Sequence, residues 1–212
     1  MARRQPGATQ WDADVIRLAA YPVEEVRNTD AWVMGQETAA LGFHQALLKM
    51  LEDSSPLVRG NAALSLVRFG DAVGRPQIVA LLQPASVKAL EPGKIVDASR
   101  PGTAIHRGGM IAKLQTGTRV VEIRSPISGR IRTLLAQTGQ TVASGGEIAS
   151  VDPDTEQAWE ALRALYLVGQ PDDIPAIVPY EREVPEVPDR LRQQAMLAEQ
   201  AIRARADQPA DK

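Results

Sequence analysis

Cysteine and histidine, two residue types that often catalyse reactions or bind metal ions, are scarce in this sequence. It contains no cysteine, which excludes disulfides, thiolate metal sites, iron–sulfur clusters and cysteine nucleophiles. Its two histidines, His44 and His106, lie in segments of different character, and no His-x-His pair occurs. We interpret His44 as a partly buried helix residue and His106 as a turn residue. The sequence therefore predicts no metal site.

Serine, glycine and carboxylate motifs indicate no catalytic site either. There is no Gly-x-Ser-x-Gly nucleophile elbow. Two Gly-Gly pairs, at 108–109 and 145–146, lack the Lys-Ser/Thr and the following helix of a phosphate-binding loop. Adjacent carboxylates at 24–25 and 172–173 lie where helices are expected to begin, and the helix dipole accounts for them. We predict no catalytic residue, no cofactor and no enzymatic activity.

The overall charge and hydropathy exclude two classes of partner. The 212 residues include 24 basic and 26 acidic side chains, so the formal net charge is −2, which argues against bulk nucleic-acid binding. No apolar run reaches the roughly 18 residues that a transmembrane helix needs. None follows Arg3 and Arg4, as it would in a signal peptide. We expect a soluble, cytoplasmic protein.

Three zones differ in their sequence pattern. Residues 9–90 are rich in Ala and Leu at helical spacing, residues 91–153 are rich in Gly and β-branched residues, and residues 154–205 are helical again with a Pro-rich connector. This order predicts an α+β fold. Either a helical body has been opened by insertion of a β domain, so that its two helical parts pack together, or three domains follow one another.

The first zone contains a repeat. Residues 25–32 align with residues 57–64 at an offset of 32. Ser55 followed by Pro56 predicts a helix cap with proline at the first helical position. The best copy resembles a HEAT repeat of the phycobilin-lyase type, which implies a helical solenoid, in the segments 47–53, 56–59, 62–64 and 69–71. In that family the residues matching Asp53 and Arg59 pair between repeats, a structural role.

The second zone is duplicated. Residues 102–114 match residues 139–151 at an offset of 37, and residues 93–96 match residues 129–132 with a displacement of one. Glycines at fixed places suit tight turns with positive φ, and the β-branched residues between them suit short strands. We expect the two halves to interlock about a pseudo-two-fold axis.

This zone resembles the biotinyl/lipoyl domain, a barrel-sandwich hybrid that HlyD-type membrane-fusion proteins of bacteria also use. The resemblance rests on residues 123–131, 139–142 and 145–149. It implies a small all-β module between the helical segments. Its expected structural residues are Gly102, Gly108, Pro126, Gly129, Gly139 and Gly145.

In carrier domains of that family, the modified lysine lies at the tip of the hairpin that joins the two halves. The matching position is Thr118, which has no amine for biotin or lipoate. The nearest lysine, Lys113, lies five residues earlier in a predicted strand. We interpret Lys113 as a solvated strand residue and keep it as a weak candidate for attachment.

Charge is unevenly distributed. Residues 93–151 carry eight basic and three acidic side chains, which leaves the helical parts acidic. This basic module could attract an acidic protein or dock on its own helical body. The third possibility is that these basic side chains are simply solvated on a strand face and bind no partner. The zone has no aromatic residue on which a nucleic-acid base could stack. The candidate interaction residues are Arg107, Arg119, Arg124, Arg130 and Arg132.

The sequence thus favours a non-catalytic interaction or scaffold protein with another protein as partner. One alternative is a biotin- or lipoate-type carrier modified on Lys113. Another is a tetrapyrrole-handling protein, which rests on the type of repeat alone. A transport adaptor is disfavoured because no signal, lipid anchor or long helical hairpin is recognised.

Overall fold

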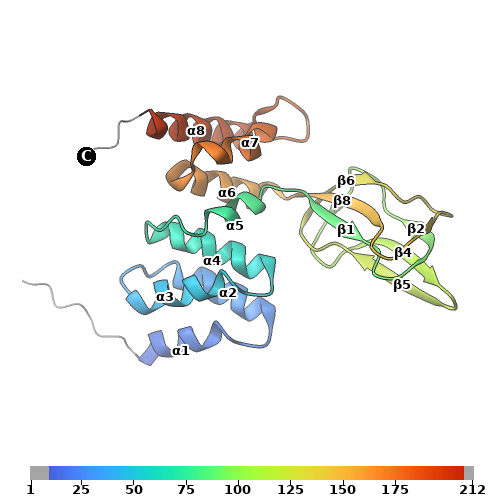
Figure 1. The fold of residues 1–212 in the computed structure, drawn as a ribbon, viewed down its shortest axis with the longest axis horizontal. Coiled ribbons are helices and arrows are strands. Elements are labelled where there is room, and N and C mark those ends of the chain that lie inside the picture. The colour runs from blue at the N-terminus through green and yellow to red at the C-terminus, as the bar shows by residue number, and fades with distance from the viewer. Residues whose placement is uncertain (1–9, 208–212) are drawn as a thin grey trace, which may run out of the picture. The chain divides into compact units, whose positions relative to one another are not determined.

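The structure, a computed structural model, describes residues 10–207 apart from the side chain of Leu41. It combines helices with antiparallel sheets, as the predicted α+β class requires. The chain divides into two compact units (Figure 1): a β unit at residues 83–158 and a helical unit from the residues on either side of it. The predicted helical zone begins at Thr9, which lies outside the described residues.

The helices of the helical unit come from both sides of the β unit in the sequence. Within residues 10–207, five helices precede the strands: α1 (Gln10–Leu18), α2 (Glu24–Met34), α3 (Leu41–Met50), α4 (Pro56–Arg68) and α5 (Arg75–Ala80). Three come after them, with two 3₁₀ turns between: α6 (Thr155–Val168), η1 (Pro171–Asp173), α7 (Ile174–Ile177), η2 (Val178–Glu181) and α8 (Asp189–Ala206).

The start of α4 follows the predicted cap. Ser55 Oγ accepts a hydrogen bond from the backbone N–H of Val58 at 3.4 Å, and Pro56 occupies the first helical position, where no N–H is needed. Gly70, just beyond the helix, has a φ of 77°. The sequence prediction of the start of α4 is confirmed.

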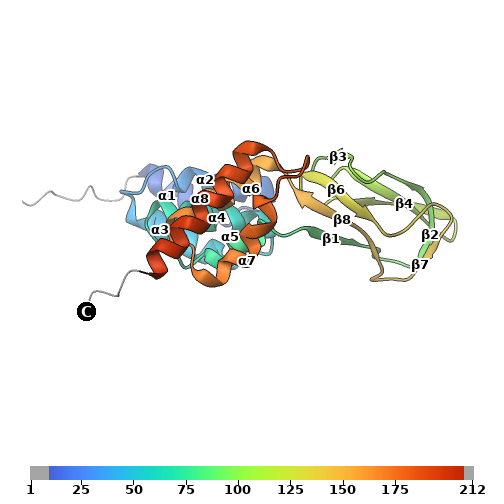
Figure 2. The ribbon, with the colours of Figure 1, turned by 90° about the horizontal axis from the view of Figure 1, so that it is seen from above.

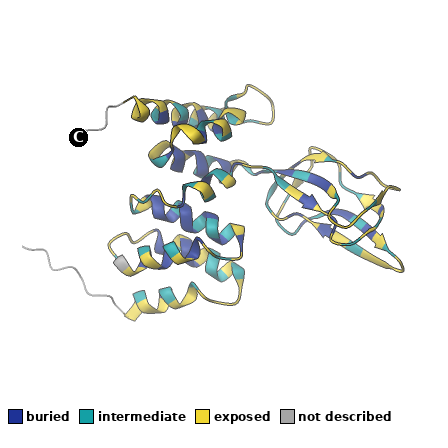
Figure 3. Cartoon of the chain, viewed as in Figure 1, coloured by how far each residue is buried: buried dark blue, intermediate teal, exposed yellow. Residues whose placement is uncertain are grey.

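Close packing holds α2 against α4. Ser65 on α4 donates a hydrogen bond of 2.8 Å to the backbone oxygen of Ala31 on α2. A Cβ placed on Gly35 would lie 2.4 Å from Ser65 Oγ, so a glycine is needed for this approach. Among the described helices, buried residues are most numerous on α4 (Figure 3).

Helices from before and after the β unit belong to one compact body. Arg75 on α5 pairs with Asp173 in η1 at 3.1 Å, and Tyr180 in η2 donates its hydroxyl to the backbone oxygen of Leu82 at 2.7 Å. Helices α7 and α8 lie side by side (Figure 2). Arg205 on α8 donates to the backbone oxygens of Leu165, Tyr166 and Gly169 at the end of α6.

The β unit consists of two four-stranded antiparallel sheets, in the orders β1-β8-β6-β3 and β5-β4-β2-β7, and not of one closed barrel. Strand β1 lies in a segment for which the sequence predicts helix, because its pairing with β8 is a long-range contact that no local pattern reveals. The strands are β1 (Ala85–Lys88), β2 (Gly93–Ala98), β3 (Ala104–Ile105), β4 (Met110–Thr116), β5 (Arg119–Arg124), β6 (Gly129–Leu134), β7 (Thr141–Val142) and β8 (Glu147–Pro153).

The two copies of the duplicated sequence also pair their strands in the same register. Ile95 on β2 pairs with Leu114 on β4, and the equivalent Ile131 on β6 pairs with Val151 on β8. The pairs β2–β7 and β3–β6 join strands of opposite halves, so each sheet contains strands from both. Six residues link β6 to β7 but five link β2 to β3, which accounts for the one-residue displacement.

Equivalent turns close the two halves. Gly108 and Gly145 both have a φ of 78°, a value that favours glycine. The N–H of Gly108 donates to the oxygen of Ser125 at 2.8 Å, and that of Gly145 donates to the oxygen of Ala89 at 2.7 Å. Gly102 and Gly139 also have positive φ, at 81° and 94°.

A shared core joins the two sheets. Its fully buried side chains come in pairs from the two halves: Ile95 with Ile131, Ile111 with Ile148, and Leu114 with Val151. Because each half supplies the same positions, the inner faces of both sheets form one continuous cluster.

Candidate functional site

The β4–β5 hairpin ends in a two-residue turn that contains Thr118, the residue that the sequence resemblance aligns with the modified lysine of carrier domains. Thr116 pairs with Arg119 across the turn, so Gly117 and Thr118 form the tip, and Gly117 has a φ of 59°. Thr118 is exposed. The tip therefore presents a hydroxyl and no amine.

Two contacts anchor the base of this hairpin. Thr116 donates its hydroxyl to the backbone oxygen of Pro92 at 3.0 Å. Arg119 pairs with Glu91 at 2.9 Å. Both contacts reach the connection between β1 and β2, so the tip is held from both sides of its turn.

Lys113 lies in the middle of β4, away from the tip. It is opposite Asp97 on β2 and opposite Glu122 on β5, and it is partly buried. Oppositely charged residues directly across a sheet stabilise each other. Lys113 therefore sits between two carboxylates on a strand face, which is different from an attachment lysine at a turn.

The candidate interaction arginines are largely occupied within the β unit. Arg119 pairs with Glu91, Arg124 with Glu122, and Arg132 with Asp152, the last at 2.6 Å. Arg130 donates to the backbone oxygen of Gly102, and Arg107 is also engaged. They are not brought together as one patch of unpaired charge.

The charge of the whole β unit is smaller than the sequence segment suggests. Residues 83–158 contain nine basic and seven acidic side chains, a net charge of +2. The shorter segment, residues 93–151, leaves out four acidic residues that belong to the unit: Glu91, Asp152, Asp154 and Glu156. The expectation of a strongly basic module is corrected accordingly, because the unit begins and ends outside that segment.

Two of the expected structural residues have clear positions. Pro126 is exposed in the bend after β5. Gly129 begins β6, where a Cβ would lie only 1.7 Å from the backbone oxygen of Asp152. Any side chain at residue 129 would collide with the neighbouring strand.

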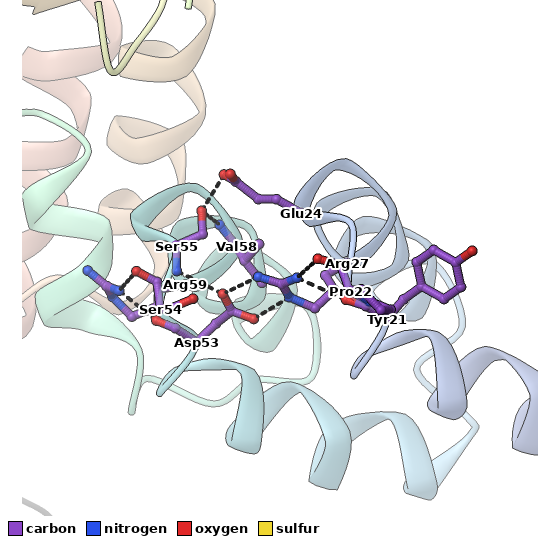
Figure 4. A network of polar contacts seen from close by, with 9 residues as sticks. All are labelled: Tyr21, Pro22, Glu24, Arg27, Asp53, Ser54, Ser55, Val58 and Arg59. Atoms are coloured by element: carbon purple, nitrogen blue, oxygen red, sulfur yellow. Dashed lines mark hydrogen bonds and ion pairs between the residues drawn. The ribbon is translucent and has the colours of Figure 1, made fainter. Parts of the chain in front are cut away.

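Asp53 and Arg59 do not pair with each other through their side chains (Figure 4). The Asp53 carboxylate accepts hydrogen bonds from Nε and Nη2 of Arg27, at 2.7 and 2.9 Å. Arg59 instead donates to the backbone oxygens of Asp53 and Ser54, at 2.6 and 3.1 Å. The hydrogen bond from Arg27 lowers the pKa of Asp53 below its usual value.

Arg27 and Arg59 occupy equivalent positions in the repeat. Arg27 donates to the backbone oxygens of Tyr21 and Pro22, at 2.9 and 3.2 Å, just as Arg59 binds the oxygens of residues six and five positions before it. Arg27 and Arg59, which are 32 residues apart, therefore make the same two backbone contacts in their own copies of the repeat. Asp53 adds a link between the two copies.

The histidines lie in different units. His44 Nε2 is 2.8 Å from Asp71 Oδ2, and its ring packs against Phe69. His106 is exposed in the loop between β3 and β4. Within residues 10–207, no group of three or more His, Cys, Asp or Glu side chains is placed to hold a metal ion. No helix in the same range combines the length and apolar character that crossing a bilayer requires.

The sequence analysis did not predict one surface of the helical unit, a strip along α2 and α4. At one end, Asn61 Nδ2 donates to Asn28 Oδ1 at 2.6 Å, and at the other end Arg68 donates to Gln36 Oε1 at 2.7 Å. Trp32, with 55% of its surface exposed, lies between them, as does the half-buried Leu64. The repeat offset aligns Trp32 with Leu64, which is the signal that could have found the strip.

Asp30 is a buried carboxyl group of α2. It is 3% exposed, and its Oδ2 has no hydrogen-bond partner among the described residues. Burial raises the pKa of Asp30 to about 7. We treat this carboxyl group as a feature of the helical core.

Comparisons with known proteins identify no family. No family model and no curated protein matches the chain. The Kluyveromyces lactis urea carboxylase aligns at 14% identity over 32% of this chain and 6% of that one, with a TM-score of 0.31. A single-chain, multi-domain long-chain acyl-CoA carboxylase aligns at 15% identity over 46% of this chain and 10% of that one, with a TM-score of 0.33. Similarity at such low identity and TM-score supports no assignment of function to this chain.

Proposed function

We propose that this chain is a non-catalytic interaction protein in which HEAT-like helical repeats carry an inserted biotinyl/lipoyl-like module that bears no attached group. One observation carries the proposal: the hairpin turn where such a module bears its lysine is Gly117-Thr118, anchored at Glu91 and Pro92. The tip is thus built as a fixed, unmodified projection. Cofactor attachment is not part of this function.

The repeated arginine contacts support the HEAT-like part of the proposal. In this view the helices of residues 9–90 and 154–205 form one interrupted solenoid, and the β module lies between α5 and α6. Helical repeats of this kind bury their apolar faces on their neighbours and leave extended surfaces for binding. The boundary of the β module then moves from 91–153 to the unit at 83–158.

The register of the β unit supports the barrel-sandwich part. Two interlocked halves with equivalent turns would close a small β structure without long unprotected edges. The partner is another protein, in the cytoplasm of a bacterium. The unit at 83–158 contains no aromatic residue, which disfavours single-stranded nucleic acid. A preference for an acidic partner is weakened by the ion pairs that already occupy Arg119, Arg124 and Arg132.

The carrier alternative would need Lys113 as its attachment site. That lysine lies between Asp97 and Glu122 in the middle of a sheet, where an enzyme that attaches biotin or lipoate would find no exposed turn. The tetrapyrrole alternative rests on the repeat type alone.

The test is affinity purification of the full chain from its native host, with cross-linking and intact mass measurement. We expect a stoichiometric protein partner and a chain mass without an adduct. An adduct that disappears in Lys113→Arg would replace the proposal with the carrier function. Turnover of a substrate that a substitution in this chain abolishes would refute it.

A further inference from the structure

The strip on α2 and α4 has a regular arrangement of chemical groups. Asn28 and Trp32 are four residues apart, so they lie along one line of the α2 surface, and Gln36 follows in the turn after the helix ends at Met34. Asn61, Leu64 and Arg68 form the matching line on α4. Because α2 and α4 pack against each other, the two lines make a ladder of three rungs.

The first rung has unused hydrogen-bonding capacity. Asn61 Nδ2 donates to Asn28 Oδ1 at 2.6 Å, which leaves Asn28 Nδ2 as a donor and Asn61 Oδ1 as an acceptor. Within residues 10–207 no further hydrogen bond reaches either atom. This pair therefore offers one donor and one acceptor, the groups that the C=O and N–H of a peptide backbone require.

The second rung is apolar. Trp32 is 55% exposed, although its ring is the largest apolar group on this face, and the half-buried Leu64 occupies the aligned position on α4. Trp combines a large contact area with little conformational freedom, which is why it is common where binding energy is concentrated. An apolar side chain of a partner would remove both from water.

The third rung carries an uncompensated positive charge. Arg68 is exposed and donates to the neutral Gln36 at 2.7 Å. Among the described residues no carboxylate pairs with it, in contrast to Arg27, whose charge is matched by Asp53. This end of the strip is therefore complementary to an acidic side chain.

We propose that this strip binds an extended peptide segment of a partner protein. The peptide backbone binds the Asn28–Asn61 pair, an apolar side chain covers Trp32 and Leu64, and an acidic side chain reaches Arg68. Along α2 and the turn that follows it, the outer rungs are eight residues apart, roughly 12 Å at the rise of a helix, which about four extended residues would span. The inference rests on the proposed interaction function and names the partner's chemistry.

The experiment pans a random-peptide display library against the full chain and measures binding of the enriched sequences as synthetic peptides. We expect those peptides to share an apolar residue close to an acidic one. Trp32→Ala should weaken their binding by about tenfold or more. Met196→Ala, at a side chain that is 56% exposed on α8, is the matched control and should leave binding unchanged. Circular dichroism and thermal unfolding establish that both variants fold.

The charge contact has its own test. Replacing the acidic residue of the peptide by alanine should weaken binding to the native chain but not to Arg68→Gln. Lack of enriched peptides, or equal binding by Trp32→Ala, would overturn the proposal. So would self-association of the native chain that Trp32→Ala abolishes, because a second copy would then occupy the strip. If Trp32→Ala still captures the stoichiometric partner, the interaction function stands and the strip is not its site.

Discussion

The carboxylate of Asp53 accepts two hydrogen bonds from the guanidinium of Arg27, at 2.7 and 2.9 Å, across the boundary between two helical repeats. Asp53 also caps its own turn, because its Oδ1 accepts the N–H of Ser55 at 2.8 Å. The pair thus ties the start of α2 to the turn that begins α4. Its side chains are only 13% and 10% exposed, so water does little to replace the contact.

Loss of this pair should destabilise the helical unit. Arg27→Ala leaves the Asp53 carboxylate partly buried without its partner, and Arg27→Lys keeps the charge but loses the two parallel hydrogen bonds. We expect both to lower the urea midpoint of unfolding, alanine more than lysine. The control is Arg17→Ala, which removes an ion pair whose side chains are 70% and 52% exposed. An equal effect of Arg17→Ala and Arg27→Ala would contradict the structural role.

The duplicated register predicts equal effects at equivalent core positions. Ile95 and Ile131 are both fully buried and occupy the same place in the two halves. Ile95→Ala and Ile131→Ala should each reduce the free energy of unfolding of the β unit by about 2–5 kcal/mol, and by similar amounts. Denaturant unfolding of the full chain, followed by hydrogen exchange within 83–158, measures both. A large inequality would show that the halves are not packed alike.

The duplication illustrates what the sequence could and could not reveal. Glycines at 102, 108, 139 and 145 mark turns by their residue type, so the offset of 37 could be read directly. The partner strands β1 and β5 were not matched, because Val87 and Ile123 share only an apolar character and their equivalence appears in pairing with Ala149 and Ala112. Strand partners are set by long-range contacts, and local patterns do not encode them.

The candidate sites were harder to predict from the sequence than the strands, because most of their contacts form only when elements pack together. The absence of an amine at residue 118 follows from the sequence alone, given the position of the turn. The Asn28–Asn61 hydrogen bond does not, because it joins residues 33 positions apart whose side chains meet only when α2 packs on α4. The same holds for the neutralisation of Arg132 by Asp152, which requires β6 to lie beside β8.

Gly129 should be among the least replaceable residues of the β unit. Gly129→Ala would place a Cβ 1.7 Å from the backbone oxygen of Asp152, so β6 and β8 would have to separate. We expect a loss of at least about 3 kcal/mol in the free energy of unfolding. Gly139→Ala is the matched control, because its φ of 94° is unfavourable for alanine but nothing lies within 4 Å of the added Cβ. It should lose only about 1–2 kcal/mol.

Hydrogen exchange distinguishes the two glycine variants. Gly129→Ala should expose the amides of β6 and β8 while those of α2 and α4 keep their protection. Similar destabilisation by both variants would mean that backbone conformation, and not the close approach of strands, determines the choice of glycine.

The buried carboxyl of Asp30 predicts how stability depends on pH. Burial raises the pKa of Asp30 to about 7 in the folded chain, whereas an unfolded aspartate has a pKa of about 3.9. Between these values the folded state holds the proton that the unfolded state has released. The free energy of unfolding therefore falls as the pH rises from about 4 to about 7.

Asp30→Asn should remove this dependence, because the amide does not ionise. We expect the variant to be more stable than the native chain by up to about 4 kcal/mol at pH values above the folded pKa, and to lose that advantage near pH 4. Burial and a hydrogen bond to Glu199 raise the pKa of Glu181 to about 7 as well. Glu181 therefore makes the free energy of unfolding depend on pH in the same way in the native chain and in Asp30→Asn. The difference between variant and native unfolding curves isolates Asp30, with the exposed Asp97→Asn as control. A difference that does not change with pH would mean that Asp30 is ionised in the folded chain and paired with a cation.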